Sequence, residues 1–323
     1  MAYRSQMEIL VMLDDLKNIY SNKRVFLTGH TGFKGSWMLA VLNYLGAKVK
    51  GYALNPDTNP SLYTLIKGNS LCKPVIADIR NKEKLEDELL SFDPDFIFHF
   101  AAQSLVRRSY KSPLETFDIN GMGTAHLLEA IKNQEKPCQV IVITTDKVYE
   151  NLEKKYAYKE KDKLGGFDPY SSSKACAEII TRSYRLSFFN PEKHDSHGKA
   201  LATARSGNVI GGGDWSADRI VPDLIRALQT GERLKVRNPN AIRPWQHVLD
   251  CLSGYLWLGA RLGDDAALAT AFNFGPAPEA QRPVLERSNS RIGRVPVHNG
   301  LGRDAVGGLL QPRGGDGVGL ADG

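Results

Sequence analysis

Residues 23–35 read KRVFLTGHTGFKG, and this stretch decides the fold. Its first six residues form a short run with β-branched and aromatic side chains that ends at a glycine, which predicts a strand. A GxxGxxG pattern follows at 29–35, and a helical pattern then runs from 34 to 45. A glycine-rich turn between a first strand and a first helix is typical of dinucleotide-binding α/β folds.

Strands and helices continue to alternate up to about residue 190. Further strands are predicted at 48–54, 74–79, 95–102 and 139–145, and further helices at 81–91 and 120–133. The run QVIVITT at 139–145 is nearly continuously apolar, as in a parallel strand covered on both faces. This order predicts an α/β fold with a Rossmann-type, doubly wound parallel sheet.

Beyond residue 190 the regular alternation weakens. LATARSGNVIG (201–211) predicts another strand and IVPDLIRALQTG (220–231) a helix, while Gly, Pro, Trp and Arg dominate the segments between them. Such loop-rich sequence is typical of a smaller substrate-binding part. We therefore expect the division that follows: an N-terminal extension at 1–19, a dinucleotide-binding domain at 20–190 to which 200–215 returns, and a mainly substrate-binding part at 191–279.

The last 44 residues, 280–323, differ in kind. They hold ten glycines and six arginines but no Lys, Phe, Tyr, Trp, Met or Cys. Sequence of this type buries too little apolar surface to offset the entropy of ordering. It is either a disordered tail or the product of a reading-frame slip near residue 280. The complete loss of lysine favours the slip, and we assign no function to this segment.

Composition restricts the partners. The chain is 42% hydrophobic and carries a net charge of +6, enough apolar material for one large domain or two intimate ones. No apolar run approaches the roughly 18 residues that a membrane-spanning helix needs. No basic cluster interleaved with aromatic residues predicts nucleic-acid binding. The mild positive excess suits an anionic small molecule, although ordinary surface bias explains it equally well.

The cysteines and the N-terminus predict a cytoplasmic protein. Cys72, Cys138, Cys176 and Cys251 are widely scattered and form no CxxC pair, as expected of thiols in a reducing compartment. The N-terminal residues lack a small-residue cleavage site, so we expect no signal peptide. No cluster has metal-ligand spacing, and we expect no metal.

The glycine pattern is suited to holding a pyrophosphate. Gly29 makes the tight turn, Gly32 lets the backbone approach the ligand, and Gly35 permits close packing of helix and strand. Thr31 and Phe33 complete this loop, and the helix that follows supplies N–H groups and partial positive charge. The alternative is a tight turn without a ligand.

Other residues at strand ends are candidate cofactor contacts. Asp78 and Ile79 follow the third strand, where a carboxylate accepts from an adenine amine and an aliphatic side chain stacks on the ring; Asp78 alone is also a plausible strand-end cap. Phe100-Ala101-Ala102 end the fourth strand. The acidic residue usual after the second strand is missing, with Asn55 and Asp57 nearby, so the residues alone leave NAD and NADP both open.

Tyr170 and Lys174 form a YxxxK pattern at the start of a helix. The i, i+4 spacing places both side chains on one helical face, where an ammonium stabilises a phenolate. Such a phenolate is a base for a hydroxyl proton. About 25 residues upstream, Thr145 ends the strand 139–145 and offers a hydroxyl to orient a sugar. YxxxK alone is common on surface helices; its conjunction with the glycine loop and Thr145 indicates a redox site.

Seven blocks resemble the CDP-glucose 4,6-dehydratase family of extended short-chain dehydrogenase/reductases, within the NAD-dependent epimerase/dehydratases. They are TGHTGFKGSW, FHFAAQSLVRRSY, TTDKVYEN, YSSSKACAE, RSGNVIGGGDW, DRIVPD and RPWQHVLD, and the resemblance covers about residues 20–279. It implies NAD as cofactor and dehydration of CDP-glucose to CDP-4-keto-6-deoxyglucose. It also implies supply of 3,6-dideoxyhexoses for bacterial O-antigen, and a homodimer packed through the helices at 120–133 and 171–186.

The resemblance also implies catalytic roles. Thr145, Tyr170 and Lys174 form the catalytic triad, with Tyr170 and Lys174 also contacting the cofactor, and Asp146 protonates the departing C6 hydroxyl. Lys147 stands where related dehydratases have a glutamate that removes the C5 proton. It acts as that base if burial deprotonates it, or else it positions the sugar or stabilises the enolate and leaves Tyr170 as base. The alternative for Asp146-Lys147 is a solvated ion pair.

Six polar or aromatic residues are candidate substrate contacts; two follow the fourth strand and are candidates to line the cleft between cofactor and sugar, and the other four each have a structural alternative. The six are Gln103, Ser104, Asn208, Arg219, Arg243 and Trp245. The amides and the hydroxyl suit the sugar or a phosphate, the guanidinium groups match diphosphate oxygens, and the tryptophan is a candidate wall for the base. The alternatives are a satisfied core amide, surface arginines and a packing tryptophan.

Three other functions compete with this reading. Another nucleotide-sugar 4,6-dehydratase or a 4-epimerase shares the scaffold, but an epimerase needs no acid at C6, so Asp146 discriminates. A non-enzymatic dinucleotide sensor typically lacks the tyrosine or the lysine, and both are present. An inactive product of a damaged gene would keep the catalytic residues and lose the end of the sugar-binding part.

Overall fold

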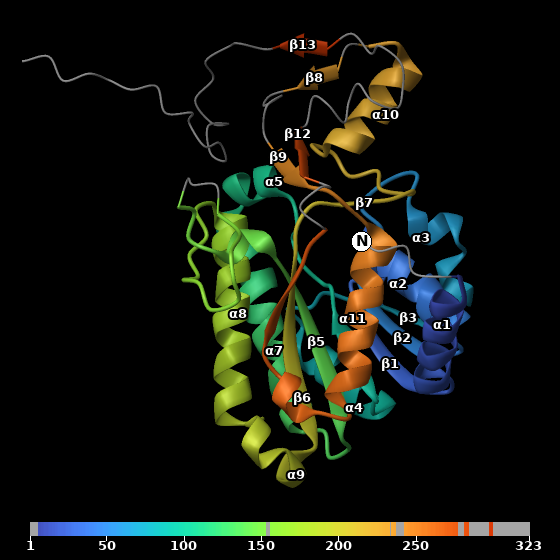
Figure 1. Ribbon diagram of the computed structural model, residues 1–323, viewed down its shortest axis with the longest axis vertical. Coiled ribbons are helices and arrows are strands. Elements are labelled where there is room, and N and C mark those ends of the chain that lie inside the picture. The colour runs from blue at the N-terminus through green and yellow to red at the C-terminus, as the bar shows by residue number, and fades with distance from the viewer. Residues whose placement is uncertain are drawn as a thin grey trace, which may run out of the picture.

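The apolar runs of the sequence form the centre of a seven-stranded sheet (Figure 1). This computed structural model describes residues 6–152, 156–232, 234–236, 242–276, 281–283 and 297–299. The strands are all parallel, in the order β11-β6-β5-β4-β1-β2-β3. In chain order they are β1 (Arg24–Thr28), β2 (Lys48–Ala53), β3 (Lys73–Ile76), β4 (Phe96–His99), β5 (Cys138–Thr145), β6 (Lys199–Ser206) and β11 (Ala271–Phe274). The predicted doubly wound sheet is confirmed.

Helices cover both faces of this sheet. On one face α1 (Gln6–Tyr20), α2 (Phe33–Tyr44) and α11 (Val248–Leu262) enclose a core with β1, β4, β5 and β6. On the other face α4 (Lys82–Phe92), α7 (Gly123–Lys132) and α8 (Pro169–Ser187) enclose a second core. Figure 1 shows the two layers on opposite sides of the strands. Shorter helices are α3 (Leu62–Leu65), α5 (Val106–Lys111), α6 (Pro113–Phe117), α9 (His194–His197) and α10 (Ile220–Thr230).

The helix predicted at 120–133 differs in its first turn. Residues Asp118–Met122 form a π-helical segment that runs into α7. Glycine is needed at the junction, because a Cβ on Gly123 would lie 2.8 Å from the Ile79 side chain. The wider π turn therefore sits where this helix packs closely against the loop after β3.

The strand predicted at 201–211 is also interrupted. β6 ends at Ser206, and a Cβ on Gly207 would lie 2.8 Å from both the Asp146 carboxylate and Pro244. The chain leaves the large sheet there and begins a smaller layer of short strand pairs together with α10. These pairs are β7 (Val209–Ile210) with β10 (Gln246–His247), β9 (Ile242–Pro244) with β12 (Gln281–Pro283), and β8 (Leu234–Val236) with β13 (Val297–Asn299).

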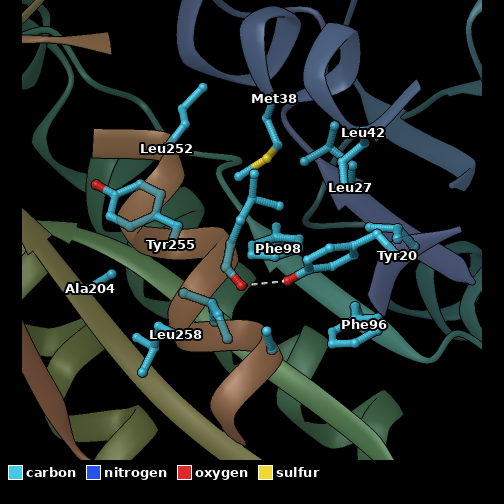
Figure 2. Packing of buried hydrophobic residues seen from close by; sticks show 14 of the residues in the cluster. Tyr20, Leu27, Met38, Leu42, Phe96, Phe98, Ala204, Leu252, Tyr255 and Leu258 are labelled. Carbon is cyan, nitrogen blue, oxygen red and sulfur yellow. Dashed lines mark hydrogen bonds between the residues drawn. The ribbon is translucent and has the colours of Figure 1, made fainter. Parts of the chain in front are cut away.

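The helix α1 packs on the large core. Leu16 and Tyr20 in its second half are buried, and the Tyr20 hydroxyl donates to the Leu256 carbonyl of α11 at 2.7 Å. Figure 2 shows the Tyr20 ring among Phe96, Phe98 and Leu27 with its hydroxyl directed at α11. The glycine at 259 provides the room, because a Cβ there would lie 2.7 Å from that hydroxyl.

The domain boundaries expected from the sequence stay predictions. Residues 1–5 and, apart from β12 and β13, the Gly/Arg-rich tail at 280–323 lie outside the described residues. Within the described part, no helix is long and apolar enough to cross a bilayer.

We predict that α1 contributes measurably to stability. Tyr20→Phe should lower the free energy of unfolding by about 1 kcal/mol, the contribution of one buried hydrogen bond. Tyr20→Ala should lower it by about 3–5 kcal/mol because it also opens a cavity. Urea unfolding measures both, and equal stability of wild type and Tyr20→Ala would contradict the packing of α1 on the core.

Candidate active site

The site lies at the carboxyl edge of the sheet, where the strand order reverses between β1 and β4. The glycine loop follows β1, and residues 100–102 follow β4. The two segments touch, since a Cβ on Gly29 would lie 2.7 Å from the Ala101 backbone nitrogen. Phe100 lies in the same crevice, beside the Lys34 ammonium. Such a switch point is where open α/β sheets bind ligands.

The loop has the geometry of a phosphate cradle. Gly29 has φ +72°, and a Cβ on Gly35 would collide with the Gly29 carbonyl, so both positions require glycine. Gly32 is exposed and caps α2 without any side-chain hydrogen bond, which leaves the first N–H groups of a 12-residue helix available to an anion. Thr31 instead donates to the Leu54 carbonyl at 2.8 Å and closes the loop onto the end of β2. These residues fit a dinucleotide pyrophosphate.

Past β3 the two candidate adenine contacts differ. The Arg80 guanidinium donates to both oxygens of the Asp78 carboxylate through its Nε and Nη2 atoms, at distances of 2.6–3.1 Å. This arginine lowers the pKa of Asp78. Ile79 is buried in the second core against Gly123. The sequence reading missed Arg80, although its i+2 position after an aspartate is a recognisable signal.

The three residues of the expected triad meet at the ends of β5 and α8. Thr145 is the last residue of β5, and α8 begins one residue before Tyr170 behind a capping box formed by Asp168 and Ser171. Burial raises the pKa of Tyr170 to about 12, and the nearby Thr145 side chain opposes this effect. The Thr145 hydroxyl donates to the Asp146 carboxyl at 3.2 Å and accepts from the Lys147 N–H at 3.4 Å. Lys174 is buried and donates to the Ile143 carbonyl at 2.9 Å.

The Asp146-Lys147 pair begins the short 3-10 turn η3 (Asp146–Val148) directly after Thr145. Both side chains are half-buried. Burial raises the pKa of Asp146, and the nearby Lys147, Thr145 and Arg243 only partly oppose it. Burial also lowers the pKa of Lys147, against the attraction of Asp146. Both shifts favour neutral forms, a carboxylic acid and a free amine, so the structure does not support a solvated ion pair.

Lys34 was missed as a site residue. Its ammonium donates to the Ser206 hydroxyl at 2.9 Å and to the Tyr255 hydroxyl at 3.0 Å. Burial and, to a smaller extent, the charge of Lys34 lower the pKa of Lys174 to about 8. A lysine within the otherwise apolar helical stretch that follows the glycine loop was the available signal.

A buried ion pair lies behind the site. Arg205 on β6 and Glu178 on α8 meet at 2.8 Å, and their side chains are only 4% and 2% exposed. Glu178 also accepts from Thr144 and Thr203, while Arg205 also donates to the Tyr149 hydroxyl. The pair thereby joins α8 to the strand ends that carry Thr145 and Ser206 and to the turn after Lys147.

Of the expected substrate contacts, the two arginines lie near the catalytic residues. Arg219 pairs with Asp214 at 2.9 Å and donates to the exposed Ser104 hydroxyl at 3.3 Å. The charge of Arg219 also lowers the pKa of Tyr170. This effect is smaller than that of burial, which raises the pKa, and that of Thr145, which lowers it. Arg243 lies close enough to Asp146 to oppose the pKa shift of that carboxyl.

The remaining three candidates have structural partners. Trp245 is buried in the small core with residues of α10 and β8. The Gln103 amide is buried and bonded to Leu105 and Thr116. Asn208 is half-buried, and its backbone carbonyl accepts from Gln246 at 3.1 Å. Contacts of these three with substrate stay predictions. Among the described residues, no group of three or more His, Cys, Asp or Glu side chains could hold a metal.

Residues 26–274 match the family model described as GDP-mannose 4,6 dehydratase. The chain belongs to the GDP-mannose 4,6-dehydratase family. It is 49% identical to a CDP-glucose 4,6-dehydratase of Salmonella typhimurium over 269 residues, which make up 83% of this chain and 75% of that protein. The resemblance seen in the sequence is therefore confirmed.

A more distant relative and a solved structure are also similar to this chain. The chain is 26% identical to the UDP-glucose 4-epimerase of Mycoplasma genitalium, in an alignment that covers 80% of this chain and 77% of the epimerase. The structure of DesIV, a dTDP-glucose 4,6-dehydratase from Streptomyces venezuelae with NAD bound, superposes with a TM-score of 0.70 at 23% identity. That superposition covers 82% of this chain and 79% of DesIV.

We predict that removing only one partner of the Arg205–Glu178 ion pair lowers the free energy of unfolding more than removing both. Glu178→Leu should lower the free energy of unfolding by about 3–5 kcal/mol, because it leaves the Arg205 charge buried without its partner. The double variant Glu178→Leu/Arg205→Met should recover most of that loss, as no charge is then buried. Urea unfolding of the singles and the double gives the coupling energy, and strictly additive losses would contradict the prediction.

Proposed function

We propose that this protein dehydrates CDP-glucose to CDP-4-keto-6-deoxyglucose with NAD as a cofactor that the reaction regenerates. The observation that carries the proposal is the Asp146-Lys147 pair beside Tyr170 and Thr145, where burial shifts the pKa of each side chain toward its neutral form. The similarity to a CDP-glucose 4,6-dehydratase supports the choice of sugar nucleotide.

NAD would be held by the glycine loop and the start of α2, by residues 100–102, and by Asp78, Ile79 and Lys174. The chemistry that bound NAD supplies is hydride exchange with the sugar, first at C4 and then at C6. The residues that directly follow β2, among them Asn55 and Asp57, include no arginine. An arginine there would accommodate the 2′-phosphate of NADP, so its absence from this segment supports NAD.

For oxidation at C4, Tyr170 takes the proton of the C4 hydroxyl, and Thr145 orients that hydroxyl. Lys174, one helical turn from Tyr170, adds positive charge that favours the phenolate. The guanidinium groups of Arg219 and Arg243 would bind the diphosphate, since both lie close to the catalytic residues.

For loss of water, Asp146 protonates the C6 hydroxyl and Lys147 removes the C5 proton. Each needs its neutral form at the start, and burial favours that form for both side chains. This favours Lys147 as the base over the alternative in which Tyr170 serves both steps. A 4-epimerase on the same scaffold would need Tyr170 but no acid at C6, so the Asp146-Lys147 pair favours dehydration.

We also propose that the reaction takes place in the cytoplasm. All four cysteines are free thiols, as expected in a reducing cytoplasm. The 4-keto-6-deoxy product is a suitable precursor for 3,6-dideoxyhexoses of an O-antigen.

We predict that, among CDP-, UDP-, dTDP- and GDP-linked sugars, CDP-glucose gives the 4-keto-6-deoxy product fastest by mass spectrometry. Asp146→Asn should lose dehydration by about 10²–10⁴-fold while still forming the 4-ketoglucose nucleotide, because only the acid at C6 is removed. The control Tyr170→Phe should lose both steps. Undiminished dehydration by Asp146→Asn, or epimerised sugar as the product, would contradict the proposal.

We also propose that the protein is a homodimer, formed through α7 and α8. Five large apolar side chains of α6, α8 and the adjoining turns are exposed, namely Leu114, Met122, Ile179, Leu186 and Phe188. α6, α7, α8 and the π-helical segment pack against one another, so these side chains lie on neighbouring elements (Figure 1). Exposed apolar surface of this kind is typical of a protein interface.

We predict that Ile179→Lys converts this dimer to a monomer by placing a charge on the exposed apolar face. Light scattering after size-exclusion chromatography measures the change. Tyr44→Lys is the matched control, since Tyr44 is 70% exposed on α2, on the opposite face of the sheet, and its replacement should leave the dimer intact. A wild-type monomer would rule the proposal out.

A further inference from the structure

The segment that joins β7 to α10 carries Arg219 at its end (Figure 1). This inference rests on the proposed function, in which Arg219 binds the diphosphate of the nucleotide sugar. We call residues 211–218 of this segment the strap. The strap begins with Gly211-Gly212-Gly213, and successive glycines have too much conformational freedom to place an arginine by themselves. The direction of Arg219 therefore depends on what holds the strap.

Two of the three glycines are held by packing against helices. A Cβ on Gly211 would lie 2.7 Å from the Val248 side chain of α11. Gly213 has φ +82°, and a Cβ there would lie 2.7 Å from the Leu62 side chain of α3. Nothing among the described residues comes within 4 Å of a Cβ on Gly212, so packing does not hold this middle residue.

A hydrogen bond from α2 holds Gly212 instead. The Trp37 indole N–H donates to the Gly212 carbonyl at 2.9 Å. The Trp37 ring also lies edge-on to the His247 ring, with the two centroids 6.4 Å apart, so the side chain sits between the strap and β10. Trp37 thus connects the helix that follows the glycine loop to the strap, and the connection needs the single donor of an indole.

The strap in turn directs Arg219 through a carboxylate that directly follows the glycines. The Asp214 side chain is 6% exposed and accepts from Arg219 Nη1 at 2.9 Å and from the Ser216 N–H at 3.1 Å. Arg219 Nη2 donates to the exposed Ser104 hydroxyl at a longer distance of 3.3 Å. The buried carboxylate therefore sets the direction of the guanidinium, and Nη2 is the group that would exchange Ser104 for a phosphate oxygen.

We propose that Trp37 is a positioning residue for the nucleotide sugar: by holding Gly212 it keeps Asp214 and Arg219 directed at the diphosphate. The diphosphate takes no part in the reaction at C4, C5 and C6, so its contacts are equally strong in the ground state and in the transition state. Loss of such a contact raises KM and leaves kcat unchanged. Trp37 therefore makes substrate binding depend on a residue of the helix that would hold the cofactor.

The experiment compares the full-length Trp37→Phe variant with wild type, by titration calorimetry with CDP and with NAD and by steady-state kinetics with CDP-glucose. Trp37→Phe should raise the Kd of CDP and the KM of CDP-glucose about three- to tenfold, the effect of one lost hydrogen bond. The kcat and the Kd of NAD should stay within about twofold of wild type, because only substrate binding is affected.

Trp257→Phe is the matched control. Trp257 lies on α11 against the large core, and its buried indole N–H has no hydrogen-bond partner in the part of the chain that the structure describes. The same replacement there should change neither the two Kd values nor the kinetic constants.

A double-mutant cycle establishes whether Trp37 acts through Arg219. Arg219→Ala should raise the Kd of CDP about 10- to 100-fold, the effect of a lost charged hydrogen bond. Trp37→Phe should add little to the loss in Arg219→Ala, because the side chain that it positions is then gone. Asp214→Ala breaks the next link and should also weaken CDP binding, which gives a second test where Trp37→Phe fails to fold by circular dichroism.

Four results would overturn the proposal: wild-type affinity for CDP in Trp37→Phe, loss of NAD affinity in its place, strictly additive losses in the cycle, or tighter CDP binding by Asp214→Ala. The last would show that the carboxylate only competes with phosphate for the arginine. Failure of the proposed function is distinguishable from all four, since wild type itself would then form no 4-keto-6-deoxy product from CDP-glucose.

Discussion

Arg205 and Glu178 meet in the interior at 2.8 Å, and the positions of the catalytic side chains depend on this contact. Glu178 lies one turn beyond Lys174 on α8, and Arg205 precedes Ser206 at the end of β6. A buried pair of this kind adds little net stability, since desolvation offsets attraction, but a mismatch between its partners is costly. It therefore fixes the register of α8 against β5 and β6 and holds Tyr170 opposite Thr145.

The sheet and the core of the site were predictable because their signals are local. Apolar runs at 23–28, 95–102 and 139–145 mark strands, and parallel strands bring their carboxyl ends to one edge. Thr145 and Tyr170 follow from that rule together with the YxxxK spacing. The glycine loop was predictable for the same reason, because Gly29 and Gly35 are required by contacts within a few residues or with the adjacent strand end.

What the sequence did not predict depends on pairings between distant residues. Lys34 follows the glycine loop but finds its partners at Ser206 and Tyr255, more than 170 residues away. Trp245 was a candidate wall for the base or a packing tryptophan, and the core in which it lies with α10 and β8 is formed by residues from separate segments. The break at Gly207 could not be read from LATARSGNVIG, because its cause is the approach of Asp146 and Pro244 from other segments.

A single physical cause, burial away from water, is the largest influence on the pKa values of the three groups to which we assign proton transfer. It raises the pKa of Asp146, lowers that of Lys147 and raises that of Tyr170. Burial thus favours the neutral acid and the neutral amine that elimination needs. For Tyr170 burial favours the protonated phenol, and Thr145 and the charge of Arg219 act against it. In water the carboxyl and the amine would rest as a carboxylate and an ammonium, neither in the state that dehydration needs. The smaller layer that begins at Gly207 brings Pro244 against that glycine and Arg243 near Asp146, so it influences the protonation state of that carboxyl.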